Sequence, residues 1–405
     1  MTISIWMRSE EHRQAGRTRL DADLIIVGAG LLGAAAAYFA AGIEPSLKII
    51  VVEGGRTAGA ASGRNAGFVL RGIHSYYDSC VAKYGRETAR VIYKLGEENQ
   101  RLIRSFMDSH GLSLGYEGGG SYVLASSLEE LEALSRSAQL MQEDGFNLKL
   151  HLKDPLDRGF YGAIENPDDF GIDPVKLVKT LLAASDARVL EEEPVLTIEA
   201  GGEVELVTTG YVLSAPRAIL ATNAYTAGLE PFFLPYIKAV RGQMLATAPL
   251  KKRLVDKLCY ANYGFEYFRQ LQDMRLVLGG GRQAFAEEEV GLADEITPAL
   301  QRNLEEYLRE RFPEAAGAHI EHRWSGAMAF THDGLPYVGS LPGRPGLFCV
   351  VGCNGHGLGY SMSLGRLVSE AVLRGAQTGC FNIERLKREP ARQDRLLAQE
   401  LKAGP

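Results

Sequence analysis

Residues 23–41 have the sequence DLIIVGAGLLGAAAAYFAA, which predicts a strand, a glycine turn and a helix in direct succession. The apolar run Leu24–Val27 suits a buried parallel strand. The spacing of Gly28, Gly30 and Gly33 is GxGxxG: the first glycine permits a tight turn, the second lets the backbone approach a pyrophosphate, and the third lets the helix pack on the strand. Because the positive end of the helix then faces the anion, the stretch predicts a dinucleotide-binding unit.

An acidic residue follows at the distance that this unit requires. The apolar run Leu47–Val52 predicts a second strand and leads to Glu53, whose carboxylate can accept hydrogen bonds from ribose hydroxyls. A GxGxxG motif alone is a weak signal, whereas strand, glycines, alanine-rich helix, strand and acid in this order are far more specific. A tight turn that binds nothing is the alternative.

The composition is that of an ordinary globular protein. The chain has 405 residues, of which 46% are apolar and 23% charged, so it is long enough for two domains. Its formal net charge of -6 gives no electrostatic reason to expect nucleic acid as a partner. The five cysteines are scattered, which argues against a disulfide framework and favours a reducing compartment, and no set of residues has metal-ligand spacing.

Residues 1–22 are polar and charged and predict an arm on the surface. They contain no apolar core of signal-peptide length, and no window of the chain approaches the roughly 18 uninterrupted apolar residues of a membrane span. We therefore expect a cytoplasmic protein without an integral membrane segment.

The rest of the chain predicts two interleaved domains. A nucleotide-binding α/β domain would consist of residues 23–72, 170–226 and 322–405, and a mixed antiparallel-sheet substrate domain of residues 73–169 and 227–321.

Two helices are expected in the substrate domain. Residues 83–110 predict a helix with Val91 on its apolar side. Ser127 and Glu130 predict a capping box for a second helix, with Leu128 facing inward.

A second glycine turn, Gly355-His356-Gly357, precedes a helix that is expected over residues 360–374. The free amides of that helix start must meet an acceptor, and water is one possibility. If a flavin occupies the nucleotide site, these amides would stabilise the negative charge that gathers near its pyrimidine end on reduction.

Blocks along nearly the whole chain resemble one family, and they run in the order that this family has. The resemblance is to the FAD-dependent amine and amino-acid oxidases and dehydrogenases of the D-amino-acid oxidase superfamily, which includes glycine oxidase, sarcosine oxidase and γ-glutamylputrescine oxidase. It implies a Rossmann-like FAD-binding domain interleaved with a mixed antiparallel-sheet substrate domain, and FAD as cofactor. The matching blocks are DLIIVGAGLLG, VVEGGRTAGAASGRNAG, ATNAY, RGQM, YFRQLQDMRLVLGGGR, WSGAMAFTHDGLPYVG and VGCNGHGLGYSMSLGRLVSEAVLRG.

The resemblance also implies the residues that contact FAD. The first three glycines would hold the pyrophosphate, Glu53 the adenosine ribose, and Val195 the adenine through its backbone. Arg64 has a plain alternative as a solvated loop charge. The further implied cofactor residues are Ala61, Ser62, Arg64, Asn65, Thr222, Asn223, Gly326, Gly355, His356 and Gly357.

The chain departs from the family pattern at four positions. Met328 stands where glycine-oxidase-like members have an arginine that pairs with the substrate carboxylate, a contact that a thioether cannot make. Gly326 stands where sarcosine-oxidase-like members have the cysteine that carries flavin covalently, so non-covalent FAD is expected. Val277 replaces a lysine linked with oxygen activation, and Gly359 a second lysine that binds substrate carboxylate.

Three residues are candidates for a catalytic role. His356 is a candidate base, although a histidine in a glycine turn also serves simply in backbone hydrogen bonds. Tyr267 belongs to an aromatic group that could enclose an amine or be plain core. Arg269 is the best remaining anchor for a distant anion, with Arg71 and Arg282 as weaker candidates.

The resulting hypothesis is FAD-dependent oxidation of a C–N bond of a primary or secondary amine to an imine, by hydride transfer to flavin N5, followed by hydrolysis. γ-Glutamylputrescine-oxidase-like chemistry fits best. Alternatives are an amino-acid oxidase or dehydrogenase, a flavin subunit of a multicomponent dehydrogenase that passes electrons to a partner, and a nicotinamide enzyme. The electron acceptor is oxygen or another molecule.

Overall fold

The predicted strand and helix form as β2 (Leu24–Val27) and α1 (Leu31–Ile43) in the computed structural model, which describes residues 17–388. β2 lies inside a six-stranded sheet. Neighbouring strands of this sheet run parallel, except for the antiparallel pair at one edge. In spatial order the strands are β19 (Tyr337–Ser340), β20 (Leu347–Val351), β13 (Ala218–Leu220), β2, β3 (Ile49–Val52) and β9 (Arg188–Leu190).

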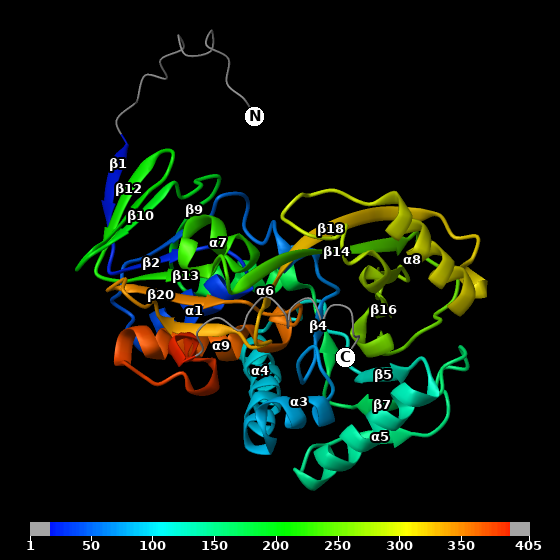
Figure 1. Cartoon of the computed structure of the whole chain (residues 1–405). Coiled ribbons are helices and arrows are strands. Elements are labelled where there is room, and N and C mark those ends of the chain that lie inside the picture. The colour runs from blue at the N-terminus through cyan, green and yellow to red at the C-terminus, as the bar shows by residue number, and fades with distance from the viewer. Residues whose placement is uncertain (1–16, 389–405) are drawn as a thin grey trace.

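This sheet is covered on both faces, which explains why its central strands are apolar at every position. Helices pack on one face, and a small four-stranded sheet packs on the other; Figure 1 shows these layers. The helices are α1, α4 (Arg86–His110), α6 (Pro174–Ala184) and α9 (Gly357–Arg374), and the small sheet consists of β1 (Thr18–Asp21), β12 (Tyr211–Ala215), β11 (Val204–Val207) and β10 (Thr197–Ala200).

The contact between α1 and α9 depends on small residues. A Cβ placed on Gly365 would lie 2.4 Å from the Cβ of Ala35, so only glycine fits at this crossing. Segments more than 300 residues apart in the sequence are thereby held together, which brings both glycine turns to the same domain.

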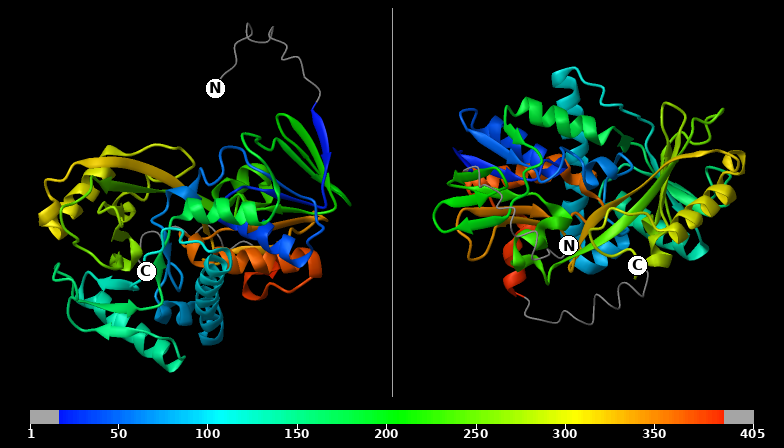
Figure 2. Two further views of the ribbon diagram at one scale, coloured as in Figure 1. Left: turned by 180° about the vertical axis from the view of Figure 1, so that it is seen from behind. Right: turned by 90° about the horizontal axis from the view of Figure 1, so that it is seen from above.

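A second large sheet has eight strands. It is antiparallel except where β15 and β5 run in parallel. α8 (Pro298–Arg311) packs on one face, and α5 (Leu128–Glu143) packs on the opposite face at the β5 end; Figure 2 shows this sheet beside the six-stranded sheet and its helices. The strands in order are β18 (Ile320–Thr331), β14 (Ile237–Thr247), β17 (Leu276–Gly280), β16 (Glu266–Gln270), β15 (Leu258–Ala261), β5 (Ser121–Ala125), β7 (Gly162–Asn166) and β6 (Lys149–His151).

Short elements complete the fold. The strands β4 (Phe68–Val69) and β8 (Phe170–Gly171) pair with each other, and α2 (Ala61–Arg64), α3 (Tyr77–Tyr84) and α7 (Thr226–Leu229) are brief helices. None of the helices within residues 17–388 has both the length and the apolar content that a bilayer crossing needs.

Several local expectations differ from the structure. β18 pairs with β14 along its length, so the expected domain boundary at residue 322 falls inside a strand of the eight-stranded sheet. The end of the expected N-terminal arm is β1, which pairs with β12, while residues 1–16 lie outside the described part of the chain. Val91 and Leu128 were expected to face inward but are 51% and 64% exposed, because α4 buries the face of Ile92 and α5 that of Leu134.

Candidate active site

The turn between β2 and α1 is tight enough to require each of its glycines. Gly28 has φ +107, and a Cβ on Gly33 would lie 1.9 Å from the carbonyl oxygen of Gly28. A Cβ on Gly30 would lie 2.6 Å from Ser62 Oγ. The N–H of Leu31 donates to that hydroxyl oxygen at 2.9 Å. Within the described residues the N–H groups of Leu32 and Gly33 meet no protein acceptor, so they are available to an anion.

Glu53 lies directly after β3 and beside this turn. Its two carboxylate oxygens accept hydrogen bonds from the N–H groups of Ala29, at 2.9 Å, and Gly55, at 2.8 Å. The segment that contains Val195 runs alongside, because the N–H of Glu193 donates to the carbonyl of Glu53 at 2.9 Å. The structure thus brings Glu53 and the residues just before Val195 together.

The arm after Glu53 is held in a defined shape by Asn65. Its side-chain amide donates to the carbonyls of Ala61 and Ser62, and its Oδ1 accepts from the N–H of Gly67. Ser62 in turn contacts the first glycine turn, as described above. Ala61, Ser62 and Asn65 are therefore one rigid element next to the N-terminus of α1.

Arg64 joins this arm to the eight-stranded sheet. Its guanidinium donates to Asp294 at 2.5 Å and to the carbonyl of Ser325 at 3.0 Å, and it also bonds the carbonyl of Gly59. The indole N–H of Trp324 donates to the carbonyl of Arg64 at 2.8 Å. The alternative of a merely solvated loop charge does not describe this residue.

The second glycine turn is fixed by two asparagines. Asn223 Oδ1 accepts from the N–H groups of Gly352 and Cys353, while Asn354 Oδ1 accepts from the N–H of Thr331 in β18. Asn223 therefore supports the turn from the β13 side; Thr222 lies against the first turn, with its Cγ2 3.5 Å from a Cβ on Gly28. Gly355, with φ +79, and His356 precede α9, which begins at Gly357.

One face of β18 connects the arm with the second turn. Along this strand Trp324, Gly326, Met328 and Phe330 alternate with fully buried residues. A Cβ on Gly326 would lie 3.2 Å from Arg64 Cβ, whereas a Cβ on Gly355 would lie 3.6 Å from Met328 Sδ and 3.7 Å from Phe330 Cζ. This face of β18 therefore extends from the arm at one end to the C-terminal turn at the other.

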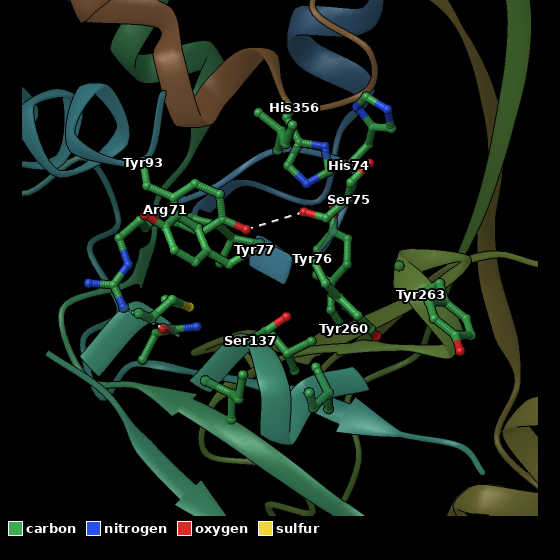
Figure 3. A pocket seen from close by; sticks show the side chains of 18 residues that line it. Arg71, His74, Ser75, Tyr76, Tyr77, Tyr93, Ser137, Tyr260, Tyr263 and His356 are labelled. Carbon is green, nitrogen blue, oxygen red and sulfur yellow. Dashed lines mark hydrogen bonds between the residues drawn. The ribbon is translucent and has the colours of Figure 1, made fainter. Parts of the chain in front are cut away.

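His356 of the second turn also lines a pocket, whose other walls come from residues 70–77 and from α4, α5, β5, β7 and β15 (Figure 3). His74 and His356 lie at one end of the pocket, and Tyr260 and Tyr263 lie toward the other. Burial lowers the pKa of His74 to about 3 and that of His356 to about 4, so both rings are neutral near pH 7. The Nδ1 of His74 has no protein partner among the described residues.

Tyr267 belongs to an aromatic cluster with Tyr260 and Phe68. Its ring stacks on that of Tyr260 with centroids 5.7 Å apart, Phe68 packs against both, and the ring of Tyr260 lies 5.8 Å from that of His356. Burial raises the pKa of Tyr267 to about 12, so the phenol stays protonated. Val277 lies on the same face, packed with Tyr267 and the side chain of Trp324.

The comparison with known families agrees with this geometry. Residues 23–371 match the family described as FAD dependent oxidoreductase, abbreviated DAO, which is most of the chain. The chain belongs to this family. Its cofactor is FAD, as predicted, and the protein is an FAD-dependent oxidoreductase.

Individual relatives of this oxidoreductase are distant but nearly full-length. The gamma-glutamylputrescine oxidoreductase of Escherichia coli (strain K12) is 27% identical over 375 residues, covering 87% of this chain and 84% of that protein. The glycine oxidase of Geobacillus kaustophilus (strain HTA426) is 26% identical over 369 residues, covering 87% and 93%.

Solved structures share the fold. The crystal structure of glycine oxidase from Geobacillus kaustophilus has a TM-score of 0.77 at 23% identity and covers 90% of this chain and 99% of that one. L-proline dehydrogenase from P. horikoshii has a TM-score of 0.76 at 19% identity, covering 91% and 98%. The predicted D-amino-acid oxidase-like fold is thereby confirmed.

The residues of this oxidoreductase fit a bound FAD. The free N–H groups of Leu32 and Gly33 suit the negative pyrophosphate, and Gly30 leaves room that a side chain would fill. Gly326 offers no nucleophile for a covalent bond to flavin, and the nearest part of the arm is the aliphatic stem of Arg64.

Two arginines that were predicted to bind a substrate anion, Arg269 and Arg71, instead form contacts within the protein. Arg269 is 4% exposed, and it donates to the backbone carbonyls of Ala66 and Gly67 and pairs with Glu117 at 3.2 Å. Arg71 is also buried, and its guanidinium bonds Glu97, Asn147 and Asn166. Arg269 thus bonds backbone carbonyls and Glu117, and Arg71 bonds Glu97, Asn166 and one carbonyl, so each guanidinium already has an acidic partner and only its Nε lacks an acceptor among the described residues.

Glu130 has a second role beside the helix cap that the sequence predicts. Its N–H donates to Ser127 Oγ as predicted, and its carboxylate accepts from the Tyr76 hydroxyl at 2.5 Å and the N–H of Tyr263 at 2.6 Å, two residues that line the pocket. The rings of Tyr76 and Tyr263 stack at 5.2 Å. One buried carboxylate therefore joins two segments of the pocket wall that are far apart in the sequence.

Proposed function

We propose that this FAD-dependent oxidoreductase oxidises the C–N bond of a primary or secondary amine to an imine, which water then hydrolyses to a carbonyl compound and, respectively, ammonia or an amine. The observation that carries the proposal is the position of Met328. It lies on the site-facing side of β18 and touches Gly355 and Gly242, where a carboxylate anchor is expected in glycine-oxidase-like members. The similarity to gamma-glutamylputrescine oxidoreductase supports the same substrate class.

In this proposal FAD is held non-covalently from both ends of the fold. Gly28, Gly30 and Gly33 would receive the pyrophosphate, and the remaining lone pairs of the Glu53 carboxylate would accept hydrogen bonds from the ribose hydroxyls. The remaining contacts come from the arm, the second turn and their supports, namely Ala61, Ser62, Arg64, Asn65, Val195, Thr222, Asn223, Gly326, Gly355, His356 and Gly357.

Bound FAD supplies the acceptor for the hydride that leaves the carbon beside nitrogen. The chain itself then needs to position the amine, exclude water and keep the nitrogen unprotonated. The stacked rings of Tyr260 and Tyr267 give a dry wall for the hydrocarbon part of the substrate. His356, with its lowered pKa, is a weak base and is better suited to accept a hydrogen bond than a proton.

A panel of candidate substrates tests the proposal. FAD-loaded protein is mixed without oxygen with alkylamines, N-alkylated amines, glycine, sarcosine and D-amino acids, and bleaching of the flavin absorption band is followed in a stopped-flow instrument. The proposal expects the amines to bleach the band faster than the α-amino acids. Reduction by glycine, sarcosine or D-amino acids but not by carboxylate-free amines would replace it with the amino-acid oxidase alternative.

A further inference from the structure

Arg282 differs from the other arginines considered for the site because nothing in the described chain neutralises it. No hydrogen bond or ion pair joins its guanidinium to another residue within 17–388, whereas Arg269 and Arg71 each have several such contacts. Glu289 is close enough to influence the pKa of Arg282, but its carboxylate is used by Arg241 and Gln243. A half-buried guanidinium is therefore left without a counter-ion.

The local sequence fixes where Arg282 lies. It follows β17 after Gly280, with φ +119, and Gly281, with φ +68, two conformations that other residues rarely adopt. A Cβ on Gly280 would lie 1.8 Å from the carbonyl oxygen of Phe265, and one on Gly281 would lie 2.6 Å from Asn303 Oδ1. The chain must turn sharply here, so Arg282 is positioned by backbone and not by a flexible loop.

Two aromatic rings hold the guanidinium beside the site. The Cζ of Arg282 lies 5.8 Å from the ring centre of Phe265 and 5.2 Å from that of Phe330. The tip of Phe330 in turn lies 3.7 Å from a Cβ placed on Gly355. Arg282 is thus separated from the second glycine turn by a single ring, on the face of the sheet that also carries Tyr267 and Met328.

From these contacts we infer that Arg282 binds a carboxylate of the substrate, at the end remote from the C–N bond that is oxidised. The inference rests on the proposed function and narrows its substrate class to amines with a distal carboxylate, such as ω-amino acids and acid-bearing derivatives of diamines. The guanidinium is planar and weakly hydrated, and the two rings beside it limit its contact with water, which favours a bidentate pair with a carboxylate. Met328 excludes the same pairing next to the reacting carbon.

The first test compares substrates of equal length on the wild-type holoenzyme. Pentylamine is compared with 5-aminopentanoate and hexylamine with 6-aminohexanoate, each by anaerobic bleaching of the flavin band over a range of concentrations. A charge-assisted pair predicts that the acid binds roughly 10- to 100-fold more tightly than the matching alkylamine, with a smaller effect on the limiting rate. Equal binding of the two series would overturn the inference.

Variants then assign the effect to the residue. Arg282→Met is expected to remove the preference for the acid, and Arg282→Lys to keep part of it. Arg302→Met is the matched control, because Arg302 is an exposed arginine of α8 and should leave the preference unchanged. FAD content and the melting temperature of each variant are recorded, and a preference that survives in a folded Arg282→Met protein contradicts the inference.

A binding measurement separates this inference from the proposed function. Oxidised holoenzyme is titrated with pentanoate, which has no amine to oxidise, by isothermal calorimetry. Binding that Arg282→Met abolishes supports the anion site even if no amine reduces the flavin, an outcome that counts against the proposed function alone. Reduction by amines without Arg282-dependent binding of pentanoate leaves the proposed function standing and refutes the anion site.

Discussion

Gly326 of β18 and Arg64 of α2 touch across the two halves of the site, since a Cβ on Gly326 would lie 3.2 Å from Arg64 Cβ. Trp324 and Ser325, the two residues that precede Gly326 in β18, bond the backbone and the guanidinium of Arg64. The arm that approaches the α1 N-terminus is therefore aligned by the eight-stranded sheet. A side chain at position 326 must push this arm away.

Gly326→Val is accordingly expected to weaken FAD binding. Overpacking of this kind costs about 1–3 kcal/mol, which corresponds to about tenfold or more in the dissociation constant of FAD. Equilibrium dialysis of the apoprotein with FAD measures the effect. Gly317→Val serves as the control, because a Cβ there meets no atom within 4 Å. Unchanged FAD affinity in Gly326→Val would show that the arm does not need this close contact.

Glu130→Gln is expected to destabilise the pocket wall. The carboxylate accepts from Tyr76, Tyr263 and the N–H of Ser126, and a glutamine amide would direct N–H groups at some of these donors. The expected loss in the free energy of unfolding is about 1–3 kcal/mol, together with a higher KM. Urea denaturation and steady-state kinetics measure the two effects, and the exposed neighbour Glu129, changed to Gln, should alter neither.

The buried histidines predict a loss of stability in mild acid. Burial lowers the pKa of His74 to about 3, whereas an unfolded histidine titrates near pH 6.5, so below that pH the unfolded chain binds a proton that the folded chain does not. The free energy of unfolding therefore falls as the pH drops from about 6.5 toward 3, and at pH 5 this residue accounts for about 2 kcal/mol.

His74→Asn removes this contribution. Chemical denaturation at pH 7 and pH 5 should show a smaller difference for the variant than for the wild type, while the exposed His319, changed to Asn, should retain the wild-type difference. An identical pH dependence in His74→Asn and the wild type would contradict the assignment.

Val277 offers a test of the electron acceptor. It is 7% exposed and packs with Tyr267 and Trp324 on the site-facing side of the sheet. A lysine there would bring a positive charge that stabilises developing superoxide. Val277→Lys is expected to raise the rate of flavin reoxidation by dissolved oxygen about tenfold or more, with Val277→Met as the neutral control. A wild type that already reoxidises rapidly in air would contradict the view that another acceptor or a partner subunit takes the electrons.

The parts of the fold that could be predicted from the sequence are those set by local geometry. Gly28, Gly30 and Gly33 identify the first turn because their spacing serves a turn, a close approach and a helix contact over six residues. The start of α5 is set locally in the same way, since Ser127 Oγ accepts from the N–H of Glu130 as the capping box predicts. Such signals need no knowledge of distant segments.

What could not be predicted depends on partners far along the chain. The sequence favours Arg269 over Arg282 as an anchor, and their surroundings in the structure reverse this order: Ala66 and Glu117 engage the first, while Phe330 flanks the second. The outward positions of Val91 and Leu128 have the same origin, because the direction of a helix face follows from what packs against it. Glu130 carries two roles, of which only the cap is local.

The central claim is that the substrate amine binds between the site-facing side of β18 and the second glycine turn of a protein that holds FAD. A crystal structure of the FAD complex with a slowly reacting amine tests it most directly. We expect the flavin ring between the arm at Ala61–Asn65 and the turn at Gly355–Gly357, with the amine in contact with Met328 and Tyr267. An amine bound elsewhere, or a flavin ring away from Gly326, would contradict the account.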